Sequence, residues 1–400
     1  MKKFFALVLA AMMAVSMLSF ASAEGYAGDI KIWVAENTVE FTKAKVDEFK
    51  AAHPEYANMN VVIEAVGEGD AASNMITDVE AGADIFGFAQ DQLARLVAAD
   101  ALLEVEESNA AAVAAENDAG AVAAVTLGET MYAYPMTSDN GYFLYYDSSV
   151  ITDPSTLEGI LAACEAAGKN FYMEINSGWY QTAFFFGAGC TLTYDTDDSG
   201  ALTACNVDYA SENGVKALRA MIDLHKSPAF VNGSSLSTAN NVAAIVDGTW
   251  DSGAAKELFG ENYAAAKLPT VAGFQMSGFG GFKMLGVKPQ TDDAKLAACD
   301  ALAAYLTSGE VQQARYEAVG WGPSNLAAQQ SDIVKADAAL SALAAQLAFT
   351  VPQGQYPNDY WSLATALGDD ILAGAYDDAD DAALLAKLTT FQETAISYAK

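Results

Sequence analysis

The first hundred residues alternate between short runs with a two-residue apolar period and longer runs with a helical period. Residues 29–34 place Ile30, Ile32 and Val34 on one face, which predicts a strand. Residues 39–52 carry one apolar stripe and predict a helix that ends near a proline. The same alternation predicts further strands at 61–66 and 84–88 and further helices at 71–81 and 90–99. Units of this kind build a parallel sheet with helices on both faces.

Two later segments have the character of crossings between lobes. Residues 132–146 are largely extended, but Pro135 and the polar cluster 137–141 interrupt them. A glycine cluster at 278–281 opens a second extended segment that runs to Val287. Between these segments, helices are predicted at 155–168 and 210–224 on either side of a hairpin, and the chain from Asp292 onward is mostly helical.

The amino terminus has the three parts of a secretory signal peptide. Lys2 and Lys3 precede an apolar run over 4–17, and small residues at 21–23 form a cleavage site. The apolar run is shorter than the roughly 20 residues that span a membrane. We therefore expect residues 1–23 to be removed and the mature chain to be exported, either to the periplasm or to the extracellular cell surface.

Charge and composition limit the classes of molecule that this chain can bind. The chain carries 52 acidic and 20 basic side chains, a formal net charge of −32, so nucleic acid and anionic membrane surfaces are disfavoured. Neutral or cationic ligands fit better. Hydrophobic residues make up 52% of the chain, and 400 residues exceed what a single core usually supports, which predicts two lobes.

The cysteines of an exported chain raise the question of a disulfide. Cys190 and Cys205 bracket a hairpin signal, and a turn centred on Asp197 and Asp198 would bring them opposite each other. We therefore predict a Cys190–Cys205 disulfide, with Cys164 and Cys299 reduced and buried in helices. The hairpin turn also matches the opening of a calcium loop over 195–206, but it ends in Asn206 instead of a bidentate Glu, so an ordinary acidic turn is favoured and no metal is expected.

Catalytic motifs are not found in the sequence. His53 and His225 have no partner at metal or triad spacing, and no nucleophile elbow, phosphate-binding loop or zinc-protease motif occurs. Gly278-Phe279-Gly280-Gly281 lacks the third glycine of a dinucleotide fingerprint and leads into a strand. No cofactor is implied.

Aromatic side chains beside polar loops are more informative. Trp179, Tyr180, Trp250, Tyr360 and Trp361 all adjoin Asn, Asp, Ser or Gly residues instead of lying within an apolar period. Flat aromatic faces next to amides and carboxylates suit a sugar, whose ring faces are apolar and whose hydroxyl edge needs donors and acceptors. Composition alone still favours structural roles for these residues.

A series of short motifs follows along the chain: Lys31-Ile32-Trp33, Ala83-Asp84-Ile85-Phe86 leading to Phe88-Ala89-Gln90-Asp91-Gln92-Leu93, Tyr134-Pro135-Met136 leading to Asp139, Asp247-Gly248-Thr249-Trp250, and Tyr360-Trp361. In this order and spacing they resemble the extracellular solute-binding proteins of carbohydrate ABC importers, most closely the maltose and maltodextrin binders. The resemblance implies a periplasmic-binding-protein-like α/β fold, with two α/β lobes, a ligand cleft and a hinge between them. Lobe 1 would comprise 27–137 plus 283–322, and lobe 2 would comprise 141–279 plus 327–400.

The resemblance also implies site residues and a mechanism. The chain departs from the maltodextrin binders at Gln92 and near Thr365, where those proteins carry Arg. The family pattern predicts a monomeric binder without enzymatic activity that captures an oligosaccharide by hinge closure and delivers it to the membrane permease subunits of an ABC importer. Its expected ligand-binding residues are Glu36, Asn37, Phe88, Asp91, Gln92, Asp139, Trp179, Tyr180, Trp250, Tyr360 and Trp361.

Two rival classes remain open at the level of sequence. A secreted glycoside hydrolase would use two carboxylates, for which Asp91 and Asp139 are candidates. A binding protein for polyamines or other non-sugar solutes would also combine aromatic rings with carboxylates, and it suits the negative charge.

Overall fold

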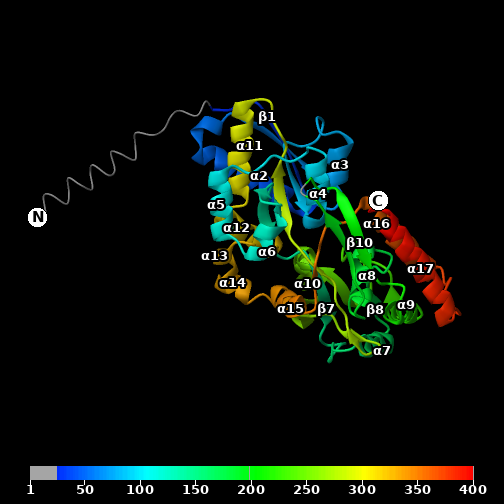
Figure 1. The fold of residues 1–400 in the computed structure, drawn as a ribbon. Coiled ribbons are helices and arrows are strands. Elements are labelled where there is room, and N and C mark those ends of the chain that lie inside the picture. Colours follow the sequence, from blue (N-terminus) through cyan, green and yellow to red (C-terminus); the bar gives the residue numbers. More distant parts are fainter. Residues whose placement is uncertain (1–24, 198, 400) are drawn as a thin grey trace, which may run out of the picture.

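The computed structural model describes residues 25–197 and 199–399, so the predicted signal segment 1–23 lies outside the described residues. The described residues form two five-stranded sheets, each wrapped by helices, and these make the two lobes in Figure 1. We call the part built on the first sheet lobe 1 and the part built on the second sheet lobe 2. No helix among the described residues has the length and apolarity needed to cross a membrane.

Lobe 1 has the strand order β2-β1-β3-β17-β6. The strands are β1 (Asp29–Val34), β2 (Asn60–Ala65), β3 (Ile85–Ala89), β6 (Tyr134–Thr137) and β17 (Lys283–Val287). The first three are parallel to one another, as the alternating pattern predicted, but β17 is antiparallel to both β3 and β6. The chain re-enters lobe 1 at the carboxyl ends of the parallel strands. Strand β17 therefore starts where the parallel strands finish and runs in the opposite direction.

Helices cover both faces of the lobe 1 sheet because the strand side chains alternate. Ile30 and Ile32 pack with α2 (Val39–Ala52) and α11 (Asp293–Leu306) on one face. Trp33 packs on the other face with α3 (Ala71–Thr77) and α4 (Leu93–Ala98). The lobe is completed by α5 (Glu107–Glu116), α6 (Ala119–Ala124), β4 (Thr126–Leu127), β5 (Thr130–Met131) and α12 (Gly309–Val319), and by the short turns η1 (Glu36–Thr38), η2 (Pro54–Tyr56) and η3 (Gln90–Gln92).

Lobe 2 repeats this plan with the strand order β11-β8-β12-β7-β13. The strands are β7 (Tyr142–Asp147), β8 (Asn170–Tyr172), β11 (Phe230–Val231), β12 (Val242–Gly248) and β13 (Tyr263–Ala266). Strands β11, β8 and β12 are parallel, and β7 is antiparallel to β12 and β13. In both sheets the antiparallel strand comes directly from a crossing between the lobes.

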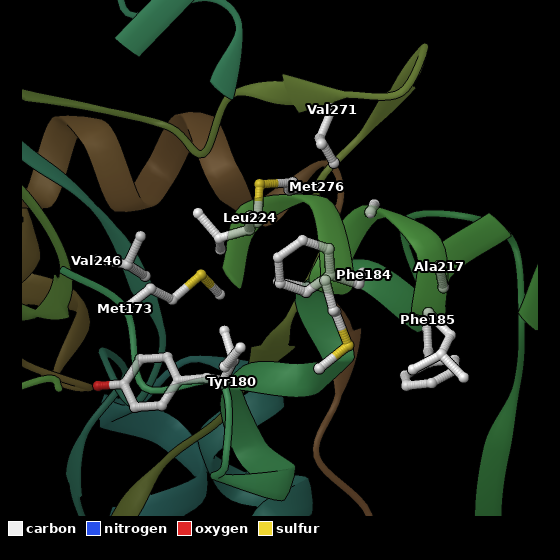
Figure 2. Packing of buried hydrophobic residues seen from close by; sticks show 14 of the residues in the cluster. Met173, Tyr180, Phe184, Phe185, Ala217, Leu224, Val246, Val271 and Met276 are labelled. Atoms are coloured by element: carbon white, nitrogen blue, oxygen red, sulfur yellow. The ribbon is translucent and has the colours of Figure 1, made fainter. Parts of the chain in front are cut away.

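The larger core lies on one face of the lobe 2 sheet. It is covered by α7 (Leu157–Ala167), α8 (Gly178–Phe185), α9 (Glu212–His225), α16 (Asn358–Leu372) and α17 (Asp381–Ser397). Figure 2 shows Met173, Phe184 and Leu224 pointing toward one another within this core. The opposite face packs against α10 (Ser252–Phe259) and α15 (Ala338–Leu347). The remaining elements of the lobe are β9 (Leu192–Thr196), β10 (Leu202–Val207), η4 (Thr249–Asp251), η5 (Gly260–Asn262), β14 (Thr270–Val271) and β15 (Phe274–Gln275).

In the described part of the chain, three segments cross between the lobes. The first joins β6 to β7, and the second joins β15 to β17 through β16 (Phe279–Gly280). These are the two predicted crossings. They lie side by side and are joined by a hydrogen bond from the N–H of Asn140 to the carbonyl of Gly281 at 3.1 Å. The third runs through α13 (Leu326–Gln329) and α14 (Asp332–Lys335) to α15, visible in Figure 1 as the orange path along one side. Strand β18 (Val351–Pro352) then pairs with β16.

The predicted Cys190–Cys205 disulfide is wrong. Cys205 lies opposite Tyr194 in the hairpin, and both cysteines are free thiols. The turn is wider than predicted because the backbone N–H of Asp197 donates a hydrogen bond to the carbonyl of Ala201. A bulge after Leu202 shifts the register further. The other two cysteines are buried, as predicted.

The same hairpin turn has the side-chain bonding of an acidic turn. The carboxylate of Asp197 accepts hydrogen bonds from the backbone N–H groups of Ser199 and Ala201. The amide of Asn206 donates to the carboxylate of Asp195 at 3.1 Å. Among the described residues, no group of three or more His, Cys, Asp or Glu side chains is arranged to hold a metal ion.

Candidate ligand-binding cleft

A cleft of about 760 Å³ lies between the two lobes. From lobe 1 it receives the loops that follow β1, β2 and β3, because the carboxyl ends of parallel strands meet at one edge of the sheet. From lobe 2 it receives the start of α8, the turn after β12 and the start of α16. The crossing segments contribute Asn140 and Trp321, and the segment that follows β18 contributes Gln353. The sequence elements predicted to carry the ligand therefore meet in one place.

Most of the predicted ligand-binding residues line this cleft. Glu36 and Asn37 follow β1, Asp91 and Gln92 follow β3, and these four come from lobe 1. Lobe 2 supplies the remaining members of the set, which are Trp179, Trp250 and Trp361.

Four predicted residues do not line the cleft. Phe88 is fully buried in lobe 1, where its ring centroid is 5.6 Å from that of Phe86. Tyr180 and Tyr360 lie in the lobe 2 core, and Figure 2 shows Tyr180 beside Met173. Tyr180 and Tyr360 are each adjacent in sequence to a tryptophan that does line the cleft. Successive helical positions point about 100° apart, and in each of these two pairs the tryptophan is the member that faces the cleft.

Asp139, the fourth, is a buried residue of the first crossing, with 1% of its surface exposed. One carboxylate oxygen accepts hydrogen bonds from the hydroxyl of Thr249 and the backbone N–H of Gly322, each at 2.5 Å. Thr249 belongs to lobe 2 and Gly322 to the third crossing. Asp139 therefore ties the first crossing to lobe 2 and to the third crossing, and its neighbour Asn140 is the residue that reaches the cleft.

The tryptophans of lobe 2 form a braced aromatic wall. The ring centroids of Trp179 and Trp250 are 5.8 Å apart, and the indole N–H of Trp179 donates to Gln353 at 3.2 Å. Trp361 packs against Tyr356 with centroids 5.3 Å apart. All three tryptophans are partly exposed, so each presents apolar ring surface to the cleft while its other contacts fix its orientation.

Trp250 is held by the backbone beneath it. A Cβ atom added to Gly248 would lie 2.1 Å from atoms of the Trp250 ring, so glycine is required for the indole to pack against the chain. Beneath it, Asp247 is fully buried, and burial together with nearby Asp251 raises the pKa of Asp247 well above its usual range.

Asp91 is the most perturbed carboxyl group that lines the cleft. It is 5% exposed, and this burial raises its pKa to about 7. Its own backbone N–H and the nearby Arg95 guanidinium oppose the rise without cancelling it. An oxygen of Glu68 is also buried, with no hydrogen-bond partner among the described residues. The lobe 1 side of the cleft therefore offers a buried carboxyl group and one Glu68 oxygen that protein groups leave unsatisfied.

Gln92 has a different role from the carboxylates. Its amide oxygen accepts from the N–H of Ala72 at 3.1 Å, and its amide nitrogen donates to the carbonyl of Gly69 at 2.8 Å. The side chain thus fixes the loop after β2 from behind the cleft surface. The cation that lines the cleft nearby is Arg95, which donates to Ser73 at 3.2 Å.

The lobes also touch beside the cleft. The side-chain oxygen of Gln355 accepts from the N–H of Ala94, and its amide donates to the carbonyl of Gln90, both at 2.9 Å. Gly200, with φ +82°, packs so tightly that an added Cβ would lie 2.1 Å from the Ala94 carbonyl oxygen. These contacts join α4 of lobe 1 to segments that lie far away in sequence.

The sequence of this chain matches a known protein family. Residues 44–342 match the family described as bacterial extracellular solute-binding protein. The chain belongs to this family. No curated protein sequence matches it.

Solved structures share the fold of this solute-binding protein over nearly its whole length. One structure described "with acarbose" is 27% identical, with 93% of this chain and 99% of the other covered and a TM-score of 0.82. The ligand-free maltodextrin-binding protein MalE1 of L. casei BL23 is 25% identical, with 94% and 100% covered and a TM-score of 0.75. MalE of Bdellovibrio bacteriovorus bound to maltotriose is 17% identical, with 92% and 100% covered and a TM-score of 0.77, and this likeness concerns the fold alone.

Several cleft residues of this solute-binding protein were not predicted from sequence: Glu68, Arg95, Asn140, Ser237, Asp251, Lys283, Trp321, Gln353 and Asn358. A signal existed for two of them. Trp321 lies in the loop Gly320-Trp321-Gly322-Pro323, and Lys283 directly follows the glycine cluster of the second crossing. Both residues line the cleft, so a polar or aromatic side chain beside a glycine-rich crossing was a usable signal.

Proposed function

We propose that this protein captures a maltodextrin-like oligosaccharide in its cleft and delivers it to the membrane permease subunits of an ABC importer. The observation that carries the proposal is a wall of partly exposed tryptophans on lobe 2 that shares the cleft with the buried Asp91 carboxyl group and an unsatisfied Glu68 oxygen of lobe 1. Sugar rings stack on aromatic faces through their apolar C–H surfaces, and their hydroxyl groups need donors and acceptors at the edge. The acarbose and maltodextrin named for the two more similar solved structures support the same ligand class.

Hinge closure is the proposed mechanism. The moving bodies would be 27–137 plus 283–322 and 141–279 plus 327–400, with the crossings as hinges. A ligand that touches Asp91 of lobe 1 and Trp361 of lobe 2 makes both sets of contacts only when the lobes are closed. Binding then shifts the population toward the closed state, whose surface the permease would recognise.

A binder is favoured over a glycoside hydrolase. Of the two carboxylates considered for hydrolysis, Asp91 lines the cleft, whereas Asp139 is buried and one of its oxygens accepts hydrogen bonds from Thr249 and Gly322. A hydrolase needs both groups beside the scissile bond. We therefore propose that the ligand is released intact, without enzymatic turnover and without a cofactor.

Export and a monomeric state complete the proposal. The signal segment 1–23 would direct the chain out of the cytoplasm, to the periplasm or the cell surface, and a net charge of −32 favours repulsion between copies.

Calorimetric titration with maltose, maltotriose, maltotetraose and maltoheptaose tests the proposed function, with spermidine as the non-sugar probe. We expect saturable binding of at least one glucan and no heat from spermidine. A reducing-end assay after prolonged incubation should detect no new ends, because a binder leaves the glycosidic bond intact. Failure of all glucans to bind, or steady release of reducing ends, would refute the proposal.

A further inference from the structure

Lys283 occupies an unusual position on the floor of the cleft. It is the first residue of β17, and its side chain lines the cleft although only 5% of the residue is exposed. The ammonium nitrogen lies 3.8 Å from the ring centroid of Trp321 and 5.0 Å from that of Trp250. Both distances are within the range of cation–π attraction.

The other lysines near aromatic rings have an additional partner or open solvent. Lys45, Lys256 and Lys387 each form an ion pair with a carboxylate at 2.8 to 3.0 Å. Lys216 lies 5.2 Å from the Phe274 centroid but is exposed. Among the described residues, the Lys283 ammonium has no carboxylate within ion-pair distance and no hydrogen-bond acceptor.

This arrangement leaves strong donors facing the cleft. An ammonium group has three N–H donors, and indole rings stabilise its charge without accepting strong hydrogen bonds. The indole N–H of Trp321 is buried without a partner among the described residues. A buried donor of this kind is normally satisfied, and both residues line the cleft, so a ligand there would meet an unpaired indole N–H and an ammonium group without a protein acceptor.

Lys283 also stands where the two lobes meet. β17 belongs to lobe 1, Trp250 follows β12 of lobe 2, and Trp321 begins the third crossing. The ammonium group therefore lies within cation–π distance of two rings from different parts of the fold, in a position where an external cation would otherwise be attracted.

We propose that Lys283 determines ligand specificity: it donates hydrogen bonds to neutral hydroxyl oxygens and excludes cationic solutes from the Trp250–Trp321 pair. The inference rests on the proposed function for the identity of the ligand as a sugar. A second positive charge next to Lys283 would be repelled in a partly desolvated site, whereas a hydroxyl group supplies the acceptor that the ammonium lacks. The acidic cleft thus rejects polyamines despite its carboxylates.

Lys283→Met tests the proposal, because it keeps the chain length and removes the charge. Lys216→Met is the matched control, since it also removes a lysine near an aromatic ring but lies outside the residues that line the cleft. Maltotetraose and spermidine are titrated into each variant and the parent by calorimetry. We expect Lys283→Met to bind maltotetraose at least tenfold more weakly, equivalent to about 1.4 kcal/mol, and to gain measurable spermidine binding. Lys216→Met should stay within about twofold of the parent.

Lys283→Arg keeps the positive charge and should still reject spermidine, which separates the role of charge from that of side-chain shape. If Lys283→Met does not fold, Lys283→Gln replaces it in the same comparison. The assignment is overturned if Lys283→Met binds maltotetraose and spermidine as the parent does, or if it binds maltotetraose more weakly without gaining spermidine binding. It is also overturned if Lys216→Met shows the same changes as Lys283→Met. A parent that binds no glucan refutes the proposed function instead, and the spermidine titrations still report on the exclusion of cations.

Discussion

Asp91→Asn should stabilise the ligand-free protein at alkaline pH, although it removes a charged residue from the cleft. Burial raises the pKa of Asp91 from 3.8 to about 7. An acid whose folded-state pKa lies above its unfolded value costs stability once the pH exceeds the unfolded value. The free energy of unfolding is therefore expected to fall as the pH rises from about 4 to about 7, and to stay lowered above that.

The size of this effect follows from the pKa difference. Each unit corresponds to 1.36 kcal/mol, so ionising Asp91 costs the folded state up to about 4 kcal/mol at pH 8. Asn keeps the shape of Asp91 and cannot ionise. Asp91→Asn should therefore unfold at a higher denaturant concentration than the parent at pH 8, with the difference shrinking toward pH 4.

Asp84 provides a control of opposite sign. It is also 5% exposed, but ion pairing with Lys295 at 2.9 Å, together with the backbone N–H of Lys31, overcomes the opposing effect of burial and holds the pKa of Asp84 below its usual value. Asp84→Asn should destabilise the protein at pH 7, and its effect should fade as the pH falls through the folded-state pKa. Urea unfolding at pH 3, 4, 7 and 8 measures both variants. Equal destabilisation by Asp91→Asn and Asp84→Asn at pH 8 would refute this reasoning.

Three further expectations follow from the cleft and the cysteines. Trp250→Ala and Trp361→Ala should each weaken glucan binding by about 2 to 4 kcal/mol, because each removes a stacking face, and should lower the melting temperature only slightly; a large loss of stability with unchanged affinity would contradict their place in the site. Saturating glucan should reduce the radius of gyration in small-angle scattering without changing the far-ultraviolet circular dichroism, and an unchanged radius would argue against closure. Labelling the unfolded protein without reductant should modify four thiols, since all four cysteines are free in the structure. If only two thiols are labelled, the other two form a disulfide and this expectation is wrong.

The sequence alone determined the elements that local periodicity controls. Predicted and observed bounds coincide for β1 and α2, because a clean two-residue or helical period ends there at an Ala or beside a proline. The first two crossings were also predictable, since the Gly-rich and polar breaks at 137–141 and 278–281 interrupt extended runs. Helices α8 and α10 were not predicted, because their glycines and aromatic residues obscure the helical period.

Only the tertiary structure decided which of two adjacent side chains faces the cleft. Trp179 and Trp361 line the cleft while Tyr180 and Tyr360 pack in the core, and composition treats the members of each pair alike. The rotation of each helix about its axis makes the choice, and that rotation is set by packing against elements far away in sequence.

The tertiary structure also decided the hairpin register and the character of the cleft floor. A single bulge after Leu202 moves Cys205 opposite Tyr194, because one extra residue shifts every later pair. Lys283 lies about 30 residues from Trp250 and about 40 from Trp321 in sequence, and only the packing of lobe 2 against the second and third crossings brings its ammonium within 5.0 Å of both ring centroids. Local propensity cannot encode such a contact, since it arises from loop closure between lobes and not from the residues on either side.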